Sequence, residues 1–212
     1  MSEELNQATK DLTLEEQPQQ PQQSAEQPLP EAELKHPLNS KWTLWYTKPS
    51  NGKEAWSDLL KPIISFSSVE EFWGIFNSVP APSELPLKGD YHLFRDDIKP
   101  EWEDIRNSEG GRWSFEFKSK NNVDINELWL RGLMSVIGET IQDDEDEVNG
   151  IVLNNRKFAY RVSLWTKTTS KSKLTAIGER FKKVLKLTDD DSIEFYVHKG
   201  SDQRDAKPIL MF

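Results

Sequence analysis

The sequence of 212 residues contains no cysteine. Disulfides, thiolate metal sites and a cysteine nucleophile are therefore excluded. The chain has only three histidines, His36, His92 and His198, and they lie far apart in the sequence. A zinc site would have too few nitrogen ligands unless carboxylates completed it, so we expect neither a metal nor a cofactor.

Long apolar runs are also missing. No segment approaches the roughly 18 apolar residues that a membrane span needs, and the N-terminal MSEELNQATK lacks the apolar centre of a signal peptide. We therefore expect a soluble, intracellular protein with no membrane partner.

The chain has no excess of positive charge, and its formal net charge is −9. Residues 1–35 hold eight acidic residues against Lys10 and Lys35, so they contribute −6 and leave −3 for the rest. Such a balance does not support a long basic groove for nucleic acid, but it allows a local basic pocket. A phosphate-bearing ligand should therefore be small and locally recognised.

The first 35 residues are rich in Gln and Pro, and the first aromatic residue of the chain is Trp42. A segment with so little apolar surface to bury cannot offset the entropy of ordering. We predict a disordered acidic tail at residues 1–35 and one domain at residues 36–212.

Periodicity predicts about seven or eight strands and three helices. Alternation of apolar and polar residues or flanking turn residues predict strands at Lys41 to Thr47, Asp90 to Arg95, Arg112 to Lys118, Gly150 to Asn155, Arg161 to Thr166, Ile193 to His198 and Pro208 to Met211. Helical spacing predicts helices at Ser67 to Asn77, Asp124 to about Ile141, and around Leu174 to Leu185. This is an α+β pattern, in which helices cover one face of an antiparallel sheet and leave the other face for a ligand.

The second predicted helix carries two apolar stripes. One stripe suits a core, and the other, formed by Leu130, Met134 and Ile141, lies on nearly the opposite side. A helix on a sheet needs only one apolar face, so the second stripe indicates a partner site. Cover by another loop of the same chain is the alternative.

The stretch KPEWEDIRNSEGGRWSFEF places Trp102 and Glu103 before a Gly110-Gly111 turn and Arg112. A flat aromatic face, a carboxylate acceptor and a guanidinium donor suit a flat, partly cationic ring that carries phosphate. The acidic run Asp143 to Glu147 could instead suggest a Mg²⁺-dependent nucleotide hydrolase. That run lacks the spacing of a metal site or of a general acid and base, so a solvated loop is favoured.

Several ordered motifs together resemble one family. KHPLNSKWTLWYTKP, VEEFW, PEWED, GGRWSF and LWLR followed by IGE, with tryptophans at 42, 45, 56, 73, 102, 113, 129 and 165, resemble eukaryotic translation initiation factor 4E, and its fungal members most. That family binds the 7-methylguanosine cap of mRNA. The resemblance runs from His36 to the C-terminus.

The resemblance implies a curved antiparallel sheet of about eight strands, three helices on its convex face and a cap-binding slot on the concave side. It implies cap base contacts from Trp56, Trp102, Glu103 and Trp165, and phosphate contacts from Arg112, Arg156 and Arg161. It also implies a surface for the scaffold factor 4G and for 4E-binding repressors, formed by His36, Pro37, Val69, Trp73, Leu130, Met134 and Gly138.

By the same resemblance the protein is a monomeric factor of cap-dependent translation rather than an enzyme, and its partners are capped mRNA, factor 4G and repressors. It is expected in the cytoplasm, with the nucleus as a second location. A specialised cap-binding paralogue that represses translation is the alternative, and a cap hydrolase is the weaker one.

Overall fold

The structure, a computed structural model, describes residues 35–143, 146–199 and 207–212. The predicted acidic tail lies outside the described residues except for Lys35, and it stays a prediction. Of the acidic run at 143–147, residues 144 and 145 also lie outside them.

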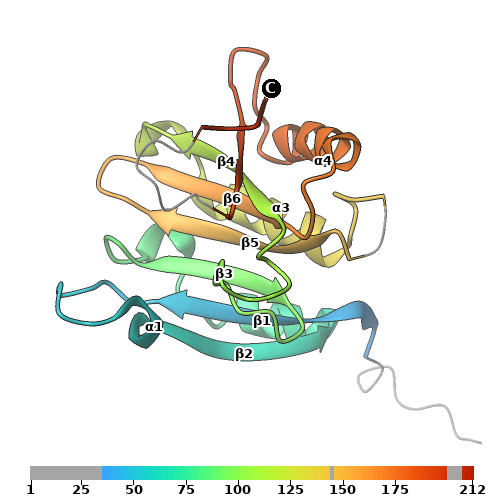
Figure 1. The fold of residues 1–212 in the computed structure, drawn as a ribbon. Coiled ribbons are helices and arrows are strands. Elements are labelled where there is room, and N and C mark those ends of the chain that lie inside the picture. Colours follow the sequence, from blue (N-terminus) through green and yellow to red (C-terminus); the bar gives the residue numbers. More distant parts are fainter. Residues whose placement is uncertain (1–34, 144–145, 200–206) are drawn as a thin grey trace, which may run out of the picture. The chain divides into compact units, whose positions relative to one another are not determined.

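Eight strands form one antiparallel sheet (Figure 1). In chain order they are β1 (Pro37–Thr47), β2 (Leu60–Ser68), β3 (Asp90–Arg95), β4 (Gly111–Phe117), β5 (Val148–Asn155), β6 (Tyr160–Thr166), β7 (Glu194–Val197) and β8 (Leu210–Met211). Across the sheet the order is β2-β1-β3-β5-β6-β4-β7-β8. Every pairing between neighbours is antiparallel.

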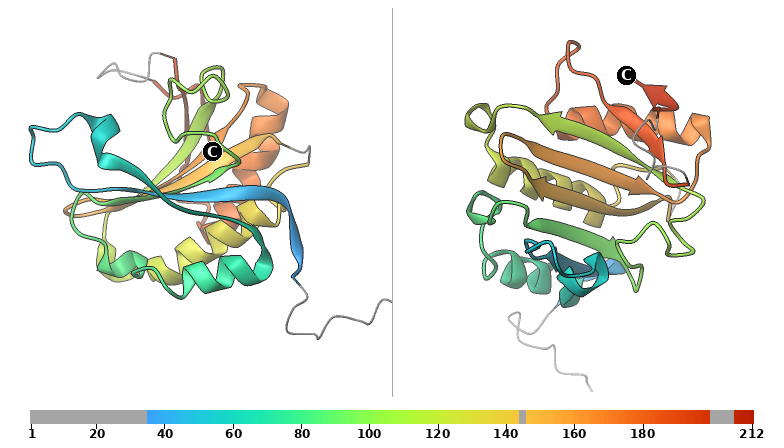
Figure 2. Two further views of the ribbon diagram at one scale, coloured as in Figure 1. Left: turned by 90° about the horizontal axis from the view of Figure 1, so that it is seen from below. Right: turned by 60° about the vertical axis from the view of Figure 1, so that its left-hand side comes forward.

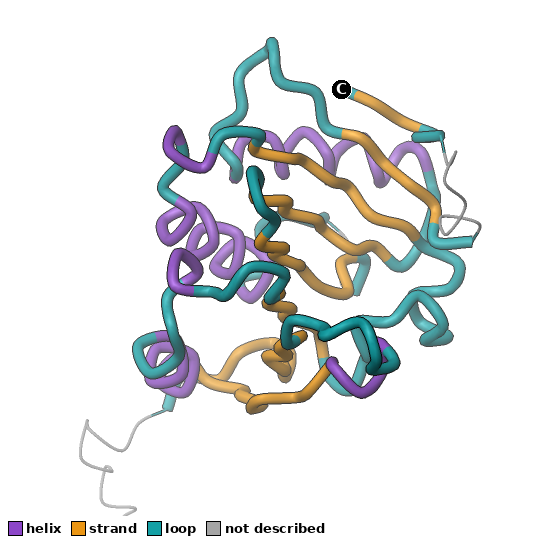
Figure 3. Tube along the Cα trace, turned by 90° about the vertical axis from the view of Figure 1, so that its left-hand side faces the viewer, coloured by secondary structure: helices purple, strands orange, loops and turns teal. Residues whose placement is uncertain are grey.

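Three helices, α2 (Val69–Phe76), α3 (Ile125–Ile137) and α4 (Lys171–Val184), lie against one face of the curved sheet (Figure 2). The one-turn helix α1 (Trp56–Leu59) and the 96–110 loop lie on the opposite side (Figure 3). Short 3₁₀ turns, η2 (Pro82–Glu84) and η3 (Lys120–Asn122), complete the described elements. The predicted α+β fold, with three helices on the convex face, is confirmed.

The core lies between the sheet and the three helices. Alternate residues of the strands enter it, including Trp42 of β1 and Trp113 of β4, both fully buried. Leu133 of α3 and Phe181 of α4 meet them from the helices. No helix in the described part of the chain is long and apolar enough to cross a membrane.

The predicted helix starts rely on side-chain caps. The Ser68 hydroxyl accepts a hydrogen bond from the Glu71 amide (3.2 Å), and the Glu71 carboxylate accepts one from the Ser67 amide (2.9 Å). This is a capping box with its return bond shifted by one residue. At α3, Asp124 accepts from the amide of Glu127 (3.1 Å), whose carboxylate instead binds Lys186.

The predicted end of the second helix was wrong. Helix α3 stops at Ile137, and the chain turns through Gly138 and Glu139, which has a φ of 54°. Ile141 follows this turn and is 1% exposed in the core, so it does not belong to the exposed stripe. Met134 is 52% exposed, as that stripe requires.

Strand β2 was not predicted from the sequence, because its residues 61–65 show no alternation of apolar and polar side chains and are all exposed. It is an edge strand, next to β1 only. An edge position tolerates Pro62, since proline has no amide hydrogen for a further ladder. Strand β1 also begins earlier than predicted, at Pro37.

Candidate functional site

The concave face carries a small apolar cluster of its own. Phe94 of β3, Val152 of β5 and Ile98 of the 96–110 loop are buried together, and Trp45 and Trp165 pack beside them. Because strand residues alternate between faces, these side chains point away from the helices. They form an aromatic floor on the side where α1 and the 96–110 loop lie.

Trp56 and Trp102 are both presented to solvent, and each is 46% exposed. Trp56 is the first residue of the one-turn helix α1 between β1 and β2. Trp102 lies in the turns between β3 and β4, with the exposed Glu103 directly after it. Neither indole belongs to the core, so part of each ring is accessible to a ligand.

The 96–110 loop is fixed from beneath by a buried asparagine that sequence analysis missed. The fully buried Asn107 amide donates to the carbonyls of Lys99 and Glu101 (2.8 Å each). The Asn149 amide in turn donates to Asn107 Oδ1 (3.0 Å). Trp102 therefore lies on a loop whose backbone is positioned by specific hydrogen bonds.

Trp165 of β6 is half-buried on the floor of the concave face. Its ring meets Phe94 edge-on at 5.3 Å between centroids, and its other neighbour is His198 at 4.1 Å. Burial, with help from the positive charge of Arg112, lowers the pKa of His198 to about 3. Burial likewise lowers the pKa of His92 to about 4. Both imidazoles are neutral at neutral pH, so the floor carries no histidine charge.

Two of the predicted basic residues come together on neighbouring strands. Arg112 of β4 lies over the Tyr196 ring at 5.8 Å, and burial together with the nearby Arg161 lowers its pKa. Arg161 of β6 pairs with Glu116 at 2.7 Å. Both arginines line an open cleft of about 840 Å³ along β4, which we call the β4 cleft.

Arg156 lies apart from that pair, after the end of β5. Its guanidinium makes two hydrogen bonds to the Asp90 carboxylate, at 2.6 and 3.1 Å. Phosphate would therefore compete with an existing ion pair at Arg156. The carboxylate partner gave no signal in the sequence, because Asp90 is 66 residues away.

The predicted partner residues lie on the opposite, helix-covered side of the sheet, and we call them together the dorsal surface: His36, Pro37, Val69, Trp73, Leu130, Met134 and Gly138. Val69 and Trp73 of α2 are 38% and 37% exposed, and Leu130 is half-buried against the core. The Trp73 ring is held by Phe72, whose centroid is 5.0 Å away. An indole supported in this way can act as a rigid anchor for a partner.

His36 is tied to α2. Its Nδ1 lies 2.6 Å from Glu70 Oε1, and its carbonyl accepts from the Val69 amide (2.9 Å). The hydrogen bond from His36 is the main cause that lowers the pKa of Glu70 to about 2. The start of the described chain is thereby fixed beside the N-terminus of α2.

The described acids of the 143–147 run are engaged in ion pairs. Asp143 pairs with Arg180 at 2.5 Å, Asp146 with Arg95 at 2.7 Å, and Glu147 with Lys173 at 3.0 Å. No group of three or more candidate metal ligands occurs within the described residues. Each described acid of the run thus has a basic partner from another element.

The model of the family described as eukaryotic initiation factor 4E matches residues 37–209. Eukaryotic translation initiation factor 4E of Candida albicans is 58% identical over the full length of both chains. That of Saccharomyces cerevisiae is 55% identical over 84% of each chain.

Two solved structures resemble the fold closely. Ascaris suum eIF4E-3 with an m2,2,7G cap has a TM-score of 0.77 at 36% identity and covers 84% of this chain and 99% of its own. C. elegans eIF4E-3 with the 4E-binding protein Mextli and a cap analog has a TM-score of 0.77 at 34% identity, over 84% and 100%. The chain therefore belongs to the eukaryotic initiation factor 4E family.

Proposed function

We propose that this protein binds the 7-methylguanosine cap of mRNA on its concave face and starts cap-dependent translation by recruiting the scaffold factor 4G. One observation carries the proposal most. Trp102 and Glu103 are exposed consecutive residues of the 96–110 loop. That loop lies on the same side of the sheet as helix α1, which begins with the exposed Trp56 (Figure 3). Similar structures of related proteins contain cap or cap analog.

Methylation at N7 gives guanine a positive charge. The cationic base stacks between the indoles of Trp56 and Trp102, which adds cation–π attraction to base stacking, roughly 1–3 kcal/mol per stack. Trp165 meets the methyl group from the floor. Because His92 and His198 are neutral, no nearby histidine charge repels the cationic ring.

Glu103 recognises the Watson–Crick edge. Guanine N1–H and N2–H both donate, so one carboxylate accepts both, at roughly 1.5–3 kcal/mol per charge-assisted bond. After the costs of association, the surplus reaches about 8 kcal/mol, or micromolar affinity and tighter. Unmethylated guanine loses the charge contribution, and adenine lacks the pair of donors.

The cap phosphates bind on the basic side. Arg112 and Arg161 are neighbours at the β4 cleft, and Arg156 joins them after exchanging its Asp90 partner for phosphate. Guanidinium groups suit this task because they bind phosphate oxygens in pairs.

Titration with 7-methyl-GTP and with GTP tests this proposal. Quenching of tryptophan fluorescence should saturate at micromolar or lower 7-methyl-GTP, while GTP binds at least about tenfold more weakly, since it lacks the cation–π energy. Equal affinities for the two nucleotides would refute the charge argument.

We also propose that the dorsal surface binds a short amphipathic helix of factor 4G, and that repressors compete for it. Exposed Met134, supported Trp73 and exposed Val69 form an apolar surface that folding alone does not require. A structure of a relative with the 4E-binding protein Mextli supports such partners.

Two substitutions separate the faces. Trp73→Ala should abolish binding of a 4G-derived peptide and leave 7-methyl-GTP affinity within about threefold, because truncating a central aromatic anchor often costs 2 kcal/mol or more. Trp102→Leu should abolish 7-methyl-GTP binding and leave the affinity for the 4G-derived peptide within about threefold. Loss of both activities in either variant would contradict separate sites.

The relatives are named as initiation factors, and the protein is not an enzyme. Capped RNA incubated with the protein and Mg²⁺ should therefore stay intact, and any turnover would revive the hydrolase alternative. We further propose that the protein acts as a monomer in the cytoplasm. A repressor paralogue would bind cap and yet fail to restore translation in an extract depleted of its initiation factor.

A further inference from the structure

The start of β1, which presents Pro37, is weakly held by the sheet. Pro37 pairs with Ser68 of β2, but the register is interrupted between Pro37 and Trp42. The pairing with β3 begins only at Trp42. The Lys41 carbonyl accepts a hydrogen bond from the Asp96 amide (2.7 Å), so it is residues 38–40 that depend on contacts outside the ladder.

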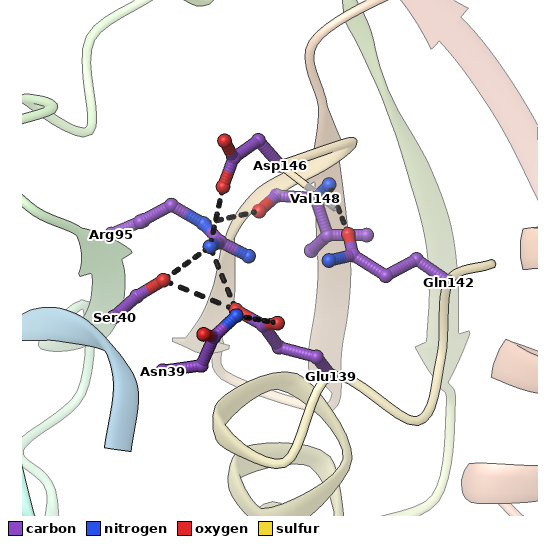
Figure 4. Close-up of polar contacts among 7 residues, drawn as sticks. All are labelled: Asn39, Ser40, Arg95, Glu139, Gln142, Asp146 and Val148. Atoms are coloured by element: carbon purple, nitrogen blue, oxygen red, sulfur yellow. Dashed lines mark hydrogen bonds and ion pairs between the residues drawn. The ribbon is translucent and has the colours of Figure 1, made fainter. Parts of the chain in front are cut away.

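Side chains supply those contacts (Figure 4). The Asn39 amide donates to Glu139 Oε2 (2.7 Å), and the Ser40 hydroxyl donates to Glu139 Oε1 (3.1 Å). Arg95 Nη1 lies 2.7 Å from the same carboxylate and also bonds Ser40. The Glu139 carboxylate thus holds the start of β1 against the end of α3.

Glu139 stands at a position where glycine would be the easier residue. Its φ of 54° follows directly after Gly138 at the end of α3, and helices often end with glycine in this conformation. A non-glycine residue with left-handed backbone is strained. Compared with glycine, a glutamate at this position adds the carboxylate that binds Asn39, Ser40 and Arg95.

We propose that Glu139, oriented by Arg95, is a positioning residue for the dorsal surface. It fixes the distance between Pro37 at the start of β1 and Gly138 directly after α3, so that an amphipathic partner helix meets both at once. This inference rests on the proposed docking of such a helix.

The other carboxylate bound by Arg95, that of Asp146, provides a matched control. Asp146 Oδ1 also lies 2.7 Å from Arg95 Nη1, and Asp146 also has a positive φ, of 66°. Asp146 makes no described contact to β1, and its side chain is 61% exposed. Glu139→Gly and Asp146→Gly therefore remove one carboxylate each from the same arginine, and both suit the backbone.

The experiment measures the affinity of each variant for a synthetic peptide that covers the 4E-binding helix of a factor 4G, and for 7-methyl-GTP. Glu139→Gly should lower the affinity for the peptide by about three- to thirtyfold, which is the range expected for a residue that acts through a packed network. Asp146→Gly should change peptide affinity less than about twofold. Both variants should keep 7-methyl-GTP affinity, which also reports that they fold.

A double-mutant cycle tests the route. Asn39→Ala should also weaken binding of the peptide. The double variant, Asn39→Ala with Glu139→Gly, should bind the peptide only slightly more weakly than Glu139→Gly alone, because both substitutions break the same connection between β1 and Glu139. Equal peptide affinities for Glu139→Gly and Asp146→Gly would overturn the inference. Failure of the unchanged protein to bind the peptide would instead refute the proposed docking.

Discussion

Acidification should destabilise the fold through His92 and His198 before it affects most carboxylates. The ordinary pKa of histidine is 6.5, and burial lowers the folded-state pKa to about 4 for His92 and about 3 for His198. Well above pH 6.5 each imidazole is neutral in both the folded and the unfolded state and costs no stability. As the pH falls below 6.5, these histidines bind protons in the unfolded chain but stay neutral in the folded chain, so the free energy of unfolding decreases.

The magnitude follows from linkage. Both folded-state pKa values lie well below 5, so the loss at pH 5 is set by the ordinary pKa and amounts to about 2 kcal/mol per histidine. The two together should cost about 4 kcal/mol between pH 7.5 and pH 5.0. That is a large part of the roughly 5–15 kcal/mol by which domains are stable.

Urea unfolding followed by tryptophan fluorescence at several pH values in this window measures the effect. His198→Phe keeps a flat ring against Trp165 and removes one titrating group. Its stability should fall by about 2 kcal/mol less than that of the unchanged protein over the same range. Parallel curves for the two proteins would show that His198 does not titrate as its burial requires, and the reasoning would fail.

Two other substitutions have defined outcomes. Glu103→Ala should cost more than about 1 kcal/mol in 7-methyl-GTP binding with an unchanged circular dichroism spectrum, because the two donors of guanine lose their acceptor. An unchanged affinity would remove Glu103 from the site. Gly111→Ala should lower stability by about 1–3 kcal/mol, since a Cβ there would lie 2.3 Å from the Tyr196 carbonyl oxygen. Thermal melting measures it, and a melting temperature equal to that of the unchanged protein would show that β4 and β7 can move apart.

Local rules predicted the parts of the fold that local chemistry determines. Ser68 and Asp124 cap their helices because an oxygen side chain lies within reach of free backbone amides. The exposure of Trp56 and Trp102 agrees with the roles that the family resemblance implies for them, whereas each tryptophan considered alone would more often lie in a core. Ile141 was misplaced because the helix ends at a glycine that the periodicity of side chains does not report.

Long-range pairings could not be predicted from local rules. Asp90 pairs with Arg156, which is 66 residues away in the sequence. The Asn149 amide, 42 residues away, donates to Asn107 beneath the loop of Trp102. Strand β2 was missed because residues 61–65 of this edge strand are all exposed and show no alternation. These contacts form only after the sheet brings distant segments together, so the chain order alone carries no signal for them.

Each strand of the sheet has one side toward the helix-covered core and one toward the concave face, and alternation decides which residue lies on which side. On β4, Trp113 enters the core while Arg112 faces the β4 cleft; on β6, Leu164 is buried in the core while Trp165 forms the concave floor. A shift of one residue in strand register would exchange every such pair. The core tryptophans therefore do more than stabilise the domain. Because a fully buried Trp113 fits only the helix side, its burial also fixes Arg112 on the opposite, concave side.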